Sequence, residues 1–182
     1  CDSLYNLYRD PSFCSDSLFD FTLWDYSVCL DAGSDSGIIG ALGDGCYAYA
    51  GPDWWVAKTG SDSLGDGSSD SPYFTIQKAV DAADSGHTVT VLPGTYTGEG
   101  NYDIDLQGKK IVLASLAGAD STIIDGENLG RDGFVMDRGY EDSSTVVRGF
   151  TITNFTRGFD LYRSFPLLRQ LQFVDNETAV DA

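Results

Sequence analysis

The pattern of apolar and polar positions divides the chain into three parts. Residues 1–50 keep neither a helical nor a strand period over any length. Residues 75–84 carry apolar side chains at i, i+3, i+4 and i+7, which predicts one short helix with a single apolar face. Thr75 is suited to be its N-cap, and Gly86 stands where a glycine often ends a helix. The apolar positions of this helix are Ile76, Ala79, Val80 and Ala83.

Short apolar runs, separated by Gly, Asp and Asn, fill the rest of the chain and predict strands. A strand is also expected at 54–58, before a loop rich in Gly, Ser and Asp at 60–71. The later predicted strands are 88–92, 103–106, 110–114, 122–124, 134–136, 145–153 and 170–174.

Two of these strands look like copies of one another. Aligning 150–156 with 172–178 pairs Ile152 with Val174 and Asn154 with Asn176, and the same step relates Val89 to Ile111. A period of roughly 20 to 30 residues that carries strands and no helix is typical of a β-solenoid. We therefore expect an all-β parallel β-helix over 53–182, with the helix at about 75–84 at its start.

Asn154 and Asn176 have two interpretations. Identical amides on successive coils can form a hydrogen-bonded asparagine ladder along the stack. Both residues also begin Asn-x-Thr sequons, so glycosylation is the alternative. We favour the ladder, because the sequons themselves recur at the coil spacing.

Charge narrows the range of partners. The formal net charge is -17, which disfavours binding to a nucleic acid backbone. No apolar stretch is long enough for a membrane span. The class that remains is a folded, acidic β protein with 42% hydrophobic residues.

All four cysteines lie in the first 50 residues, at Cys1, Cys14, Cys29 and Cys46. An even number without metal-site spacing predicts two disulfides and an oxidising compartment, with three connectivities open. We favour Cys14 with Cys29 and Cys1 with Cys46, which would make 1–50 a Cys-rich, disulfide-linked segment. Four reduced, buried thiols are the alternative.

Five segments carry a resemblance to a known family: 55–63, 75–83, 91–96, 122–126 and 147–153. They resemble the opening of right-handed parallel β-helix proteins of the pectin-lyase-like superfamily. This resemblance implies that the helix caps the N-terminal end of the solenoid. Residues 1–50 are similar to the stretch that ends such a β-helix in secreted bacterial surface proteins. That order implies either a piece of a larger tandem protein with neighbouring β-helix domains, or head-to-tail self-association.

Candidate catalytic groups are few. The single histidine, His87, is expected in a solvated turn. Asp103, Asp105 and Asp125 could supply the carboxylates of a hydrolase, but solvated surface acids are the simpler interpretation. The resemblance implies that a lyase would use a Lys or Arg base with calcium, and the hydrolase signatures of the family are absent. The candidate bases are Lys109, Lys110, Arg148 and Arg169.

Two further features point to binding. Asp62, Asp66 and Asp70 are spaced like part of a Ca²⁺ loop, although Leu64 replaces a ligand position and no Glu closes the loop. Neighbouring Trp54 and Trp55 point to opposite faces of a strand, so one ring could stack on a sugar.

We therefore expect a non-catalytic extracellular or cell-surface module with a structural, adhesive or self-assembling role that could bind a polysaccharide. The alternative is a fragment of a polysaccharide lyase or hydrolase that acts on acidic glycans. No catalytic residue is assigned.

Overall fold

The computed structural model describes residues 13–15, 20–24, 44–46, 52–136 and 141–182. The chain divides into two units, Cys1–Ala48 and Tyr49–Ala182. In the first unit, β1 (Phe13–Ser15) pairs antiparallel with β2 (Asp20–Trp24), and β2 pairs parallel with β3 (Asp44–Cys46).

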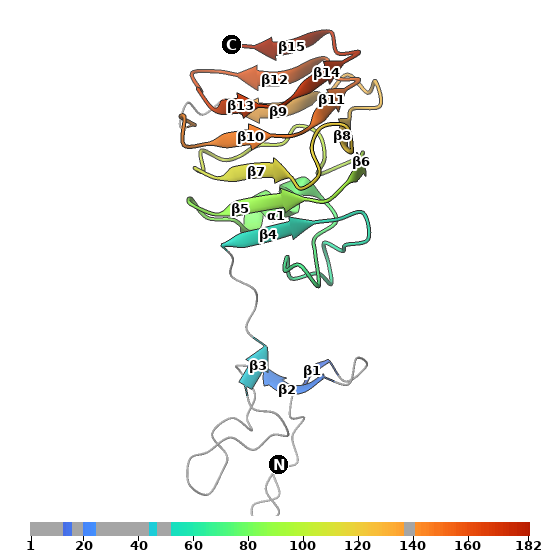
Figure 1. Ribbon diagram of the computed structural model, residues 1–182, viewed down its shortest axis with the longest axis vertical. Helices are drawn as coiled ribbons and strands as arrows, with labels where there is room; N and C mark the ends of the chain where they lie inside the picture. The colour runs from blue at the N-terminus through green and yellow to red at the C-terminus, as the bar shows by residue number, and fades with distance from the viewer. Residues whose placement is uncertain (1–12, 16–19, 25–43, 47–51, 137–140) are drawn as a thin grey trace, which may run out of the picture. The chain divides into compact units, whose positions relative to one another are not determined.

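The second unit is a β-solenoid built from three parallel sheets (Figure 1). The five-stranded first sheet has the order β13-β10-β7-β5-β4, the second has the order β14-β11-β8-β6, and the third has the order β15-β12-β9. The first sheet contains β4 (Asp53–Val56), β5 (Thr88–Val91), β7 (Val112–Ser115), β10 (Val146–Arg148) and β13 (Leu167–Arg169). The second contains β6 (Gly94–Tyr96), β8 (Thr122–Asp125), β11 (Thr151–Thr153) and β14 (Gln172–Val174). The third contains β9 (Asp132–Met136), β12 (Arg157–Leu161) and β15 (Thr178–Asp181). The prediction of an all-β solenoid is confirmed.

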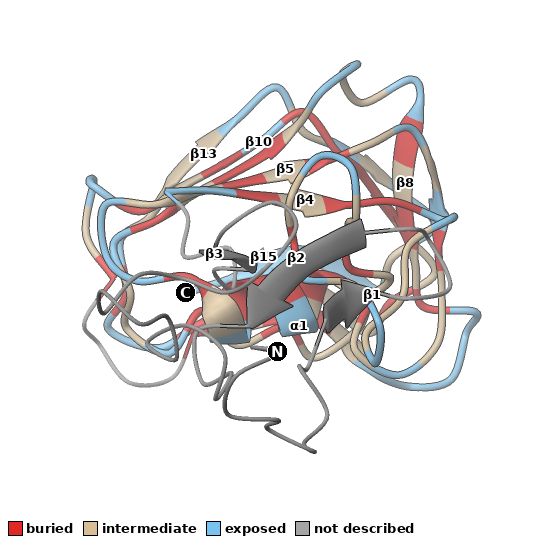
Figure 2. Cartoon of the chain, turned by 90° about the horizontal axis from the view of Figure 1, so that it is seen from below, coloured by how far each residue is buried: buried red, intermediate tan, exposed pale blue. Residues whose placement is uncertain are grey.

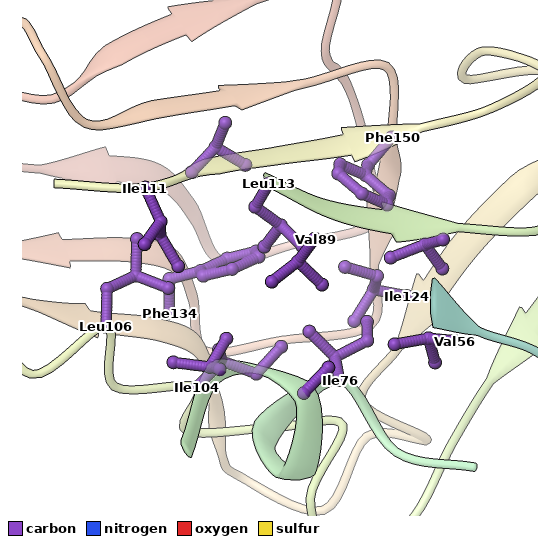
Figure 3. Packing of buried hydrophobic residues seen from close by; sticks show 14 of the residues in the cluster. Val56, Ile76, Val89, Ile104, Leu106, Ile111, Leu113, Ile124, Phe134 and Phe150 are labelled. Carbon is purple, nitrogen blue, oxygen red and sulfur yellow. The ribbon is translucent and has the colours of Figure 1, made fainter. Parts of the chain in front are cut away.

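The single helix, α1 (Ile76–Ala82), forms where the apolar period predicts it. Thr75 is its N-cap, and its side chain accepts from the backbone N–H of Lys78. The helix ends at the C-cap Ala83, so Gly86 lies in the following turn rather than directly after the helix. The buried face of α1 packs into the same core as the strands of the first coils (Figure 3).

The core is one cluster of buried side chains inside the coils. Figure 2 marks the buried residues along the chain, and Figure 3 shows the packing of part of the cluster. Val89, Leu113 and Val147 occupy matching positions of successive strands in the first sheet, and each is fully buried. Because side chains alternate along a strand, their neighbours in sequence point outward.

The coil spacing differs from the predicted one. Thr151 pairs with Gln172 and Ile152 with Phe173, so the last two coils are offset by 21 residues rather than 22. The earlier step is also different, because Val89 pairs with Leu113 and not with Ile111. The number of residues per coil therefore varies, because the turns between strands differ in length.

The predicted strands differ from the observed strands in three respects. The segment 103–106 forms only an isolated bridge, between Ile104 and Phe134. The run 145–153 is two strands, because Gly149 at φ +82° turns the chain from the first sheet into the second. The sequence pattern also omits β1, β2, β3, β6, β12, β13 and β15.

Candidate functional site

The outer surface of the first sheet presents a row that we call the arginine row. Its members pair in register from strand to strand and alternate with the core positions, although Ala114 is itself buried. Figure 1 shows the strands that carry them stacked along the solenoid. In order from β4 to β13, the row is Trp55, Thr90, Ala114, Arg148 and Arg169.

Arg148 and Arg169 are direct neighbours across the pairing of β10 with β13. Both side chains are exposed. Within the part of the chain that the structure describes, neither guanidinium has a carboxylate or other hydrogen-bonding partner. Neighbouring strands lie about 4.8 Å apart, so the two like charges repel each other unless an anion lies between them. The pair is therefore suited to bind an anionic ligand.

A second outward row runs beside the first and is apolar. Val112, Val146 and Leu167 pair in register on β7, β10 and β13, and each is half-buried. Together the two rows form what we call the first-sheet face: apolar side chains beside two guanidinium groups. Such a surface suits a ligand that carries both apolar and acidic groups.

Most other described cations are already used by the fold. Lys109 Nζ donates to the carbonyls of Val80 and Asp81, 2.8 and 3.0 Å away, at the C-terminal end of α1. Lys110 pairs with Asp142 at 2.8 Å. Of the four candidate bases, only Arg148 and Arg169 are thus available to a ligand.

The third sheet carries an ion-pair cluster centred on Arg157, which the sequence analysis does not identify. Arg157 pairs with Asp132 at 2.6 Å and with Asp160 at 2.7 Å, and Asp181 lies 3.5 Å away. The hydrogen bonds with Asp132 raise the pKa of Arg157 above its ordinary value. A guanidinium held by three carboxylates is suited to join coils, because it is permanently charged and already paired.

The three candidate hydrolase carboxylates are not gathered in one site. Asp103 pairs with Arg131 and accepts from the backbone N–H of Asp132. Asp105 accepts from the N–H of Gln107 at 2.6 Å. Asp125, at the end of β8 in the second sheet, accepts from Asn154 Nδ2 at 2.8 Å. Each carboxylate therefore stabilises a local turn or a contact between coils.

In the loop predicted to bind Ca²⁺, the first carboxylate, that of Asp62, is hydrogen-bonded to the residues just before α1. Asp62 Oδ1 accepts from the backbone N–H groups of Phe74 and Thr75, and Oδ2 accepts from the Thr75 hydroxyl. Asp66 accepts from the N–H of Ser68, and Asp70 is exposed. Among the described residues, no three His, Cys, Asp or Glu side chains are arranged to hold a metal ion. The loop thus supports the start of α1, and calcium binding by Asp62, Asp66 and Asp70 stays a prediction.

The two tryptophans differ in burial, as their alternation predicts. Trp54 is 4% exposed and donates from Nε1 to His87 Nδ1 at 3.0 Å. His87 Nδ1 also accepts from the N–H of Asp84, so this histidine is half-buried and bonded rather than solvated. Trp55 points outward in the arginine row and is half-buried, and only this tryptophan is placed to meet a ligand.

Asn154 and Asn176 do not form the predicted ladder. The coils pair with a step of 21 residues, so the two amides are offset by one position and do not lie opposite each other. Asn154 donates to Asp125. Asn176 accepts from the N–H of Phe155 at 3.0 Å and donates to the carbonyl of Ile152 at 2.8 Å. Each amide therefore bonds to the preceding coil separately.

The disulfide prediction is not tested by the geometry. Cys1 and Cys29 lie outside the described residues, and the side chains of Cys14 and Cys46, in β1 and β3, are also outside them. The disulfides stay a prediction.

Within the described residues, no helix is long and apolar enough to cross a membrane.

Comparisons with known proteins agree with the fold. Residues 58–107 match a family described as a protein of unknown function, DUF1565. A pectate lyase, PEL9, from Emericella nidulans is 41% identical over 80 residues, which is 42% of this chain and 19% of the relative. A solved rhamnogalacturonan lyase has a TM-score of 0.52 at 17% identity, covering 70% of this chain and 37% of that structure. The chain thus spans much less than half of either lyase. Together with the three stacked parallel sheets, these matches show that the fold of the chain is a parallel β-helix, similar to that of the solved rhamnogalacturonan lyase.

Proposed function

We propose that this protein is an extracellular β-helix module that binds an acidic polysaccharide on its first-sheet face without cleaving it. The single observation that carries the proposal is the register of Arg148 with Arg169, two exposed guanidinium groups that have no partner among the described residues. The planar fork of arginine matches a carboxylate with two parallel hydrogen bonds. A polymer of acidic sugars presents such carboxylates repeatedly along its length.

The acidic character of the whole chain opposes this binding at long range, since the net charge is -17. At physiological ionic strength, however, charges are screened over about 8 Å. Contacts within that distance therefore decide the affinity, and the first-sheet face has arginines there. Val146 and Leu167 beside them offer an apolar surface to the sugar rings.

The test is the affinity for polygalacturonate, with a neutral galactan as the control ligand. We expect the double variant Arg148→Gln/Arg169→Gln to bind polygalacturonate about tenfold more weakly or worse, since a charged hydrogen bond is worth about 1.5–3 kcal/mol. Lys58→Gln/Lys78→Gln removes the same charge elsewhere and should change little. Equal losses in both variants would reduce the binding to non-specific charge attraction, and an unmodified protein that binds no acidic glycan would refute the proposal.

Catalysis is the second candidate function, because both matched proteins are named as lyases. Incubation with polygalacturonate and alginate, followed by detection of unsaturated or reducing ends, tests it. Release of such ends that disappears in Arg148→Gln or Arg169→Gln would replace the binding proposal with a lyase.

The extracellular placement and the assembly are separate parts of the proposal. Peptide mapping that finds Cys1, Cys14, Cys29 and Cys46 in disulfides would support an oxidising compartment, and four free thiols would contradict it. Among the described strands, β13, β14 and β15 each pair on one side, and a strand edge can associate with another strand. Sedimentation of the isolated chain tests head-to-tail self-association, which a stable monomer would exclude.

A further inference from the structure

The turn between β12 and β13, residues 162–166, exposes two large aromatic side chains. Tyr162 is 58% exposed and Phe165 is 77% exposed. Single exposed apolar residues need no explanation, but two aromatic rings within four positions form a local patch. Their exposure costs free energy in water and is recovered when a ligand covers them.

This turn is held in place from below by a buried carboxylate. Glu141 is 2% exposed, and its side chain accepts from the Ser164 hydroxyl and from the backbone N–H of Gly108, both at 2.8 Å. The backbone carbonyl of Glu141 also accepts from the N–H of Phe165 at 2.9 Å. Burying a charged group is costly without such bonds, so the anchor fixes the turn in one conformation. A fixed turn loses little entropy when a ligand binds.

Arg163, between the two rings in sequence, adds charge and backbone strain. Its φ of +56° is in the left-handed region, which is strained for a non-glycine residue. Its guanidinium lies 5.2 Å from the centre of the Tyr162 ring. Within the described part of the chain, it has no carboxylate partner. With Arg148 and Arg169, three such arginines belong to β10, β13 and the turn that leads into β13.

The turn continues directly into the first-sheet face. Pro166 leads to Leu167 in the apolar row, and Arg169 follows two positions later in the arginine row. Figure 1 shows β12 and β13 at neighbouring levels of the solenoid, joined by this turn. The aromatic rings therefore lie at the edge of the face that carries the proposed binding function.

We propose that residues 162–166 form a ring-stacking subsite for the same acidic polysaccharide, in which Tyr162 and Phe165 pack on sugar rings and Arg163 pairs with a sugar carboxylate. This subsite rests on the proposed function. An aromatic ring beside a guanidinium matches a sugar that has an apolar C–H face and an acidic edge. A protein partner fits less well, because a stable protein interface buries about 800 Å² on each side, far more than two side chains provide.

The experiment compares two double variants with the unmodified protein, using polygalacturonate at low and high salt. We expect Tyr162→Ser/Phe165→Ser to bind about fivefold to tenfold more weakly at both salt concentrations, because stacking is not screened by ions. The arginine pair's contribution should instead fall as salt rises. Leu64→Ser/Leu129→Ser removes exposed apolar side chains elsewhere, 87% and 59% exposed, and serves as the matched control.

The outcomes separate the subsite from the function. If Arg148→Gln/Arg169→Gln abolishes binding while Tyr162→Ser/Phe165→Ser does not change it, the subsite is refuted and the proposed function stands. If the aromatic variant loses affinity no more than the leucine control, the subsite is likewise refuted. If the unmodified protein binds no acidic glycan, both proposals fall. All substituted side chains are exposed, so unchanged thermal midpoints should accompany each measurement.

Discussion

The rings of Phe134 and Phe159 stack 4.5 Å apart and within 6° of parallel, one coil above the other. Both are fully buried, and Phe173 meets Phe159 edge-on at 6.1 Å in the next coil. The three rings join successive coils through side chains, in addition to the backbone ladder. The solenoid thus depends on contacts between coils that no single coil can make alone.

The first prediction concerns this stack. Phe159→Ala should lower the free energy of unfolding by about 3–5 kcal/mol, because it removes a buried ring and leaves a cavity. Phe165→Ala, at an exposed position, should change it by less than about 0.5 kcal/mol. Urea denaturation of both variants measures the difference. Similar losses would contradict the stacked core.

The second prediction concerns the amides that join coils. Asn176→Ala removes two bonds to the preceding coil, at Phe155 N–H and Ile152 carbonyl, and should cost about 1–3 kcal/mol. Asn154→Gly loses one bond but relieves a positive φ of +62°, so its cost should be smaller. If urea denaturation showed the same loss of unfolding free energy in both variants, the expected difference between the two amides would be contradicted. A glycan found on either residue by mass spectrometry would also conflict with these bonds.

The helix and the solenoid could be predicted because their signals are local. The spacing of Ile76, Ala79 and Val80 fixes one apolar face whatever packs on it. The coil register could not be predicted in the same way. Asn154 and Asn176 look equivalent in the sequence. The lengths of the turns set the register of the strands, however, and in the structure Ile152 pairs with Phe173.

Two glycines show why β12 was missed. Gly133 and Gly158 lie within β9 and β12, where glycine usually indicates a turn. A Cβ at Gly133 would lie 2.6 Å from the carbonyl oxygen of Gly158, and one at Gly158 would lie 2.6 Å from that of Ala179. The close approach of the next coil requires glycine there, and the sequence alone does not reveal that approach.

The candidate site was predicted only in part. Arg148 and Arg169 stood among four candidate bases, but only the register of β10 with β13 shows that they are neighbours. The turn at 162–166 has a weak sequence signal, an arginine between two aromatic residues, and its hydrogen bonds with the buried Glu141 are known only from the structure. Both features depend on contacts between residues of different coils, which the sequence pattern does not show.

The third prediction concerns pH at the exposed pair of Lys110 and Asp142. The hydrogen bond from Lys110, followed by that from the N–H of Ser144, lowers the pKa of Asp142 from 3.8 to about 2. A lowered pKa in the folded state stabilises the protein above pH 3.8, and that contribution is lost as the pH falls toward 2. Lys110→Gln should move the Asp142 pKa back toward 3.8, as measured by NMR of the carboxyl carbon. An unchanged pKa in the variant would show that Lys110 is not the main cause.

The last prediction concerns Tyr96 at alkaline pH. This side chain is fully buried, its hydroxyl donates to the carbonyl of Leu92 at 2.8 Å, and burial raises its pKa from 10.0 to about 12. A raised pKa in the folded state means that the neutral phenol stabilises the protein below pH 10, and this contribution is lost as the pH rises toward 12.

The substitution Tyr96→Phe separates the hydroxyl's hydrogen bond from its ionisation. At pH 7 the variant should be less stable by about 0.5–1.5 kcal/mol, because the hydrogen bond to Leu92 is lost. Between pH 10 and 12 the unmodified protein should lose about 2–3 kcal/mol that the variant keeps, since each pKa unit is worth about 1.4 kcal/mol. The order of stability should therefore reverse on the alkaline side. Denaturation curves of both proteins across this range test the reversal, and a stability difference that does not change with pH would show that Tyr96 ionises as readily in the folded chain as in the unfolded one.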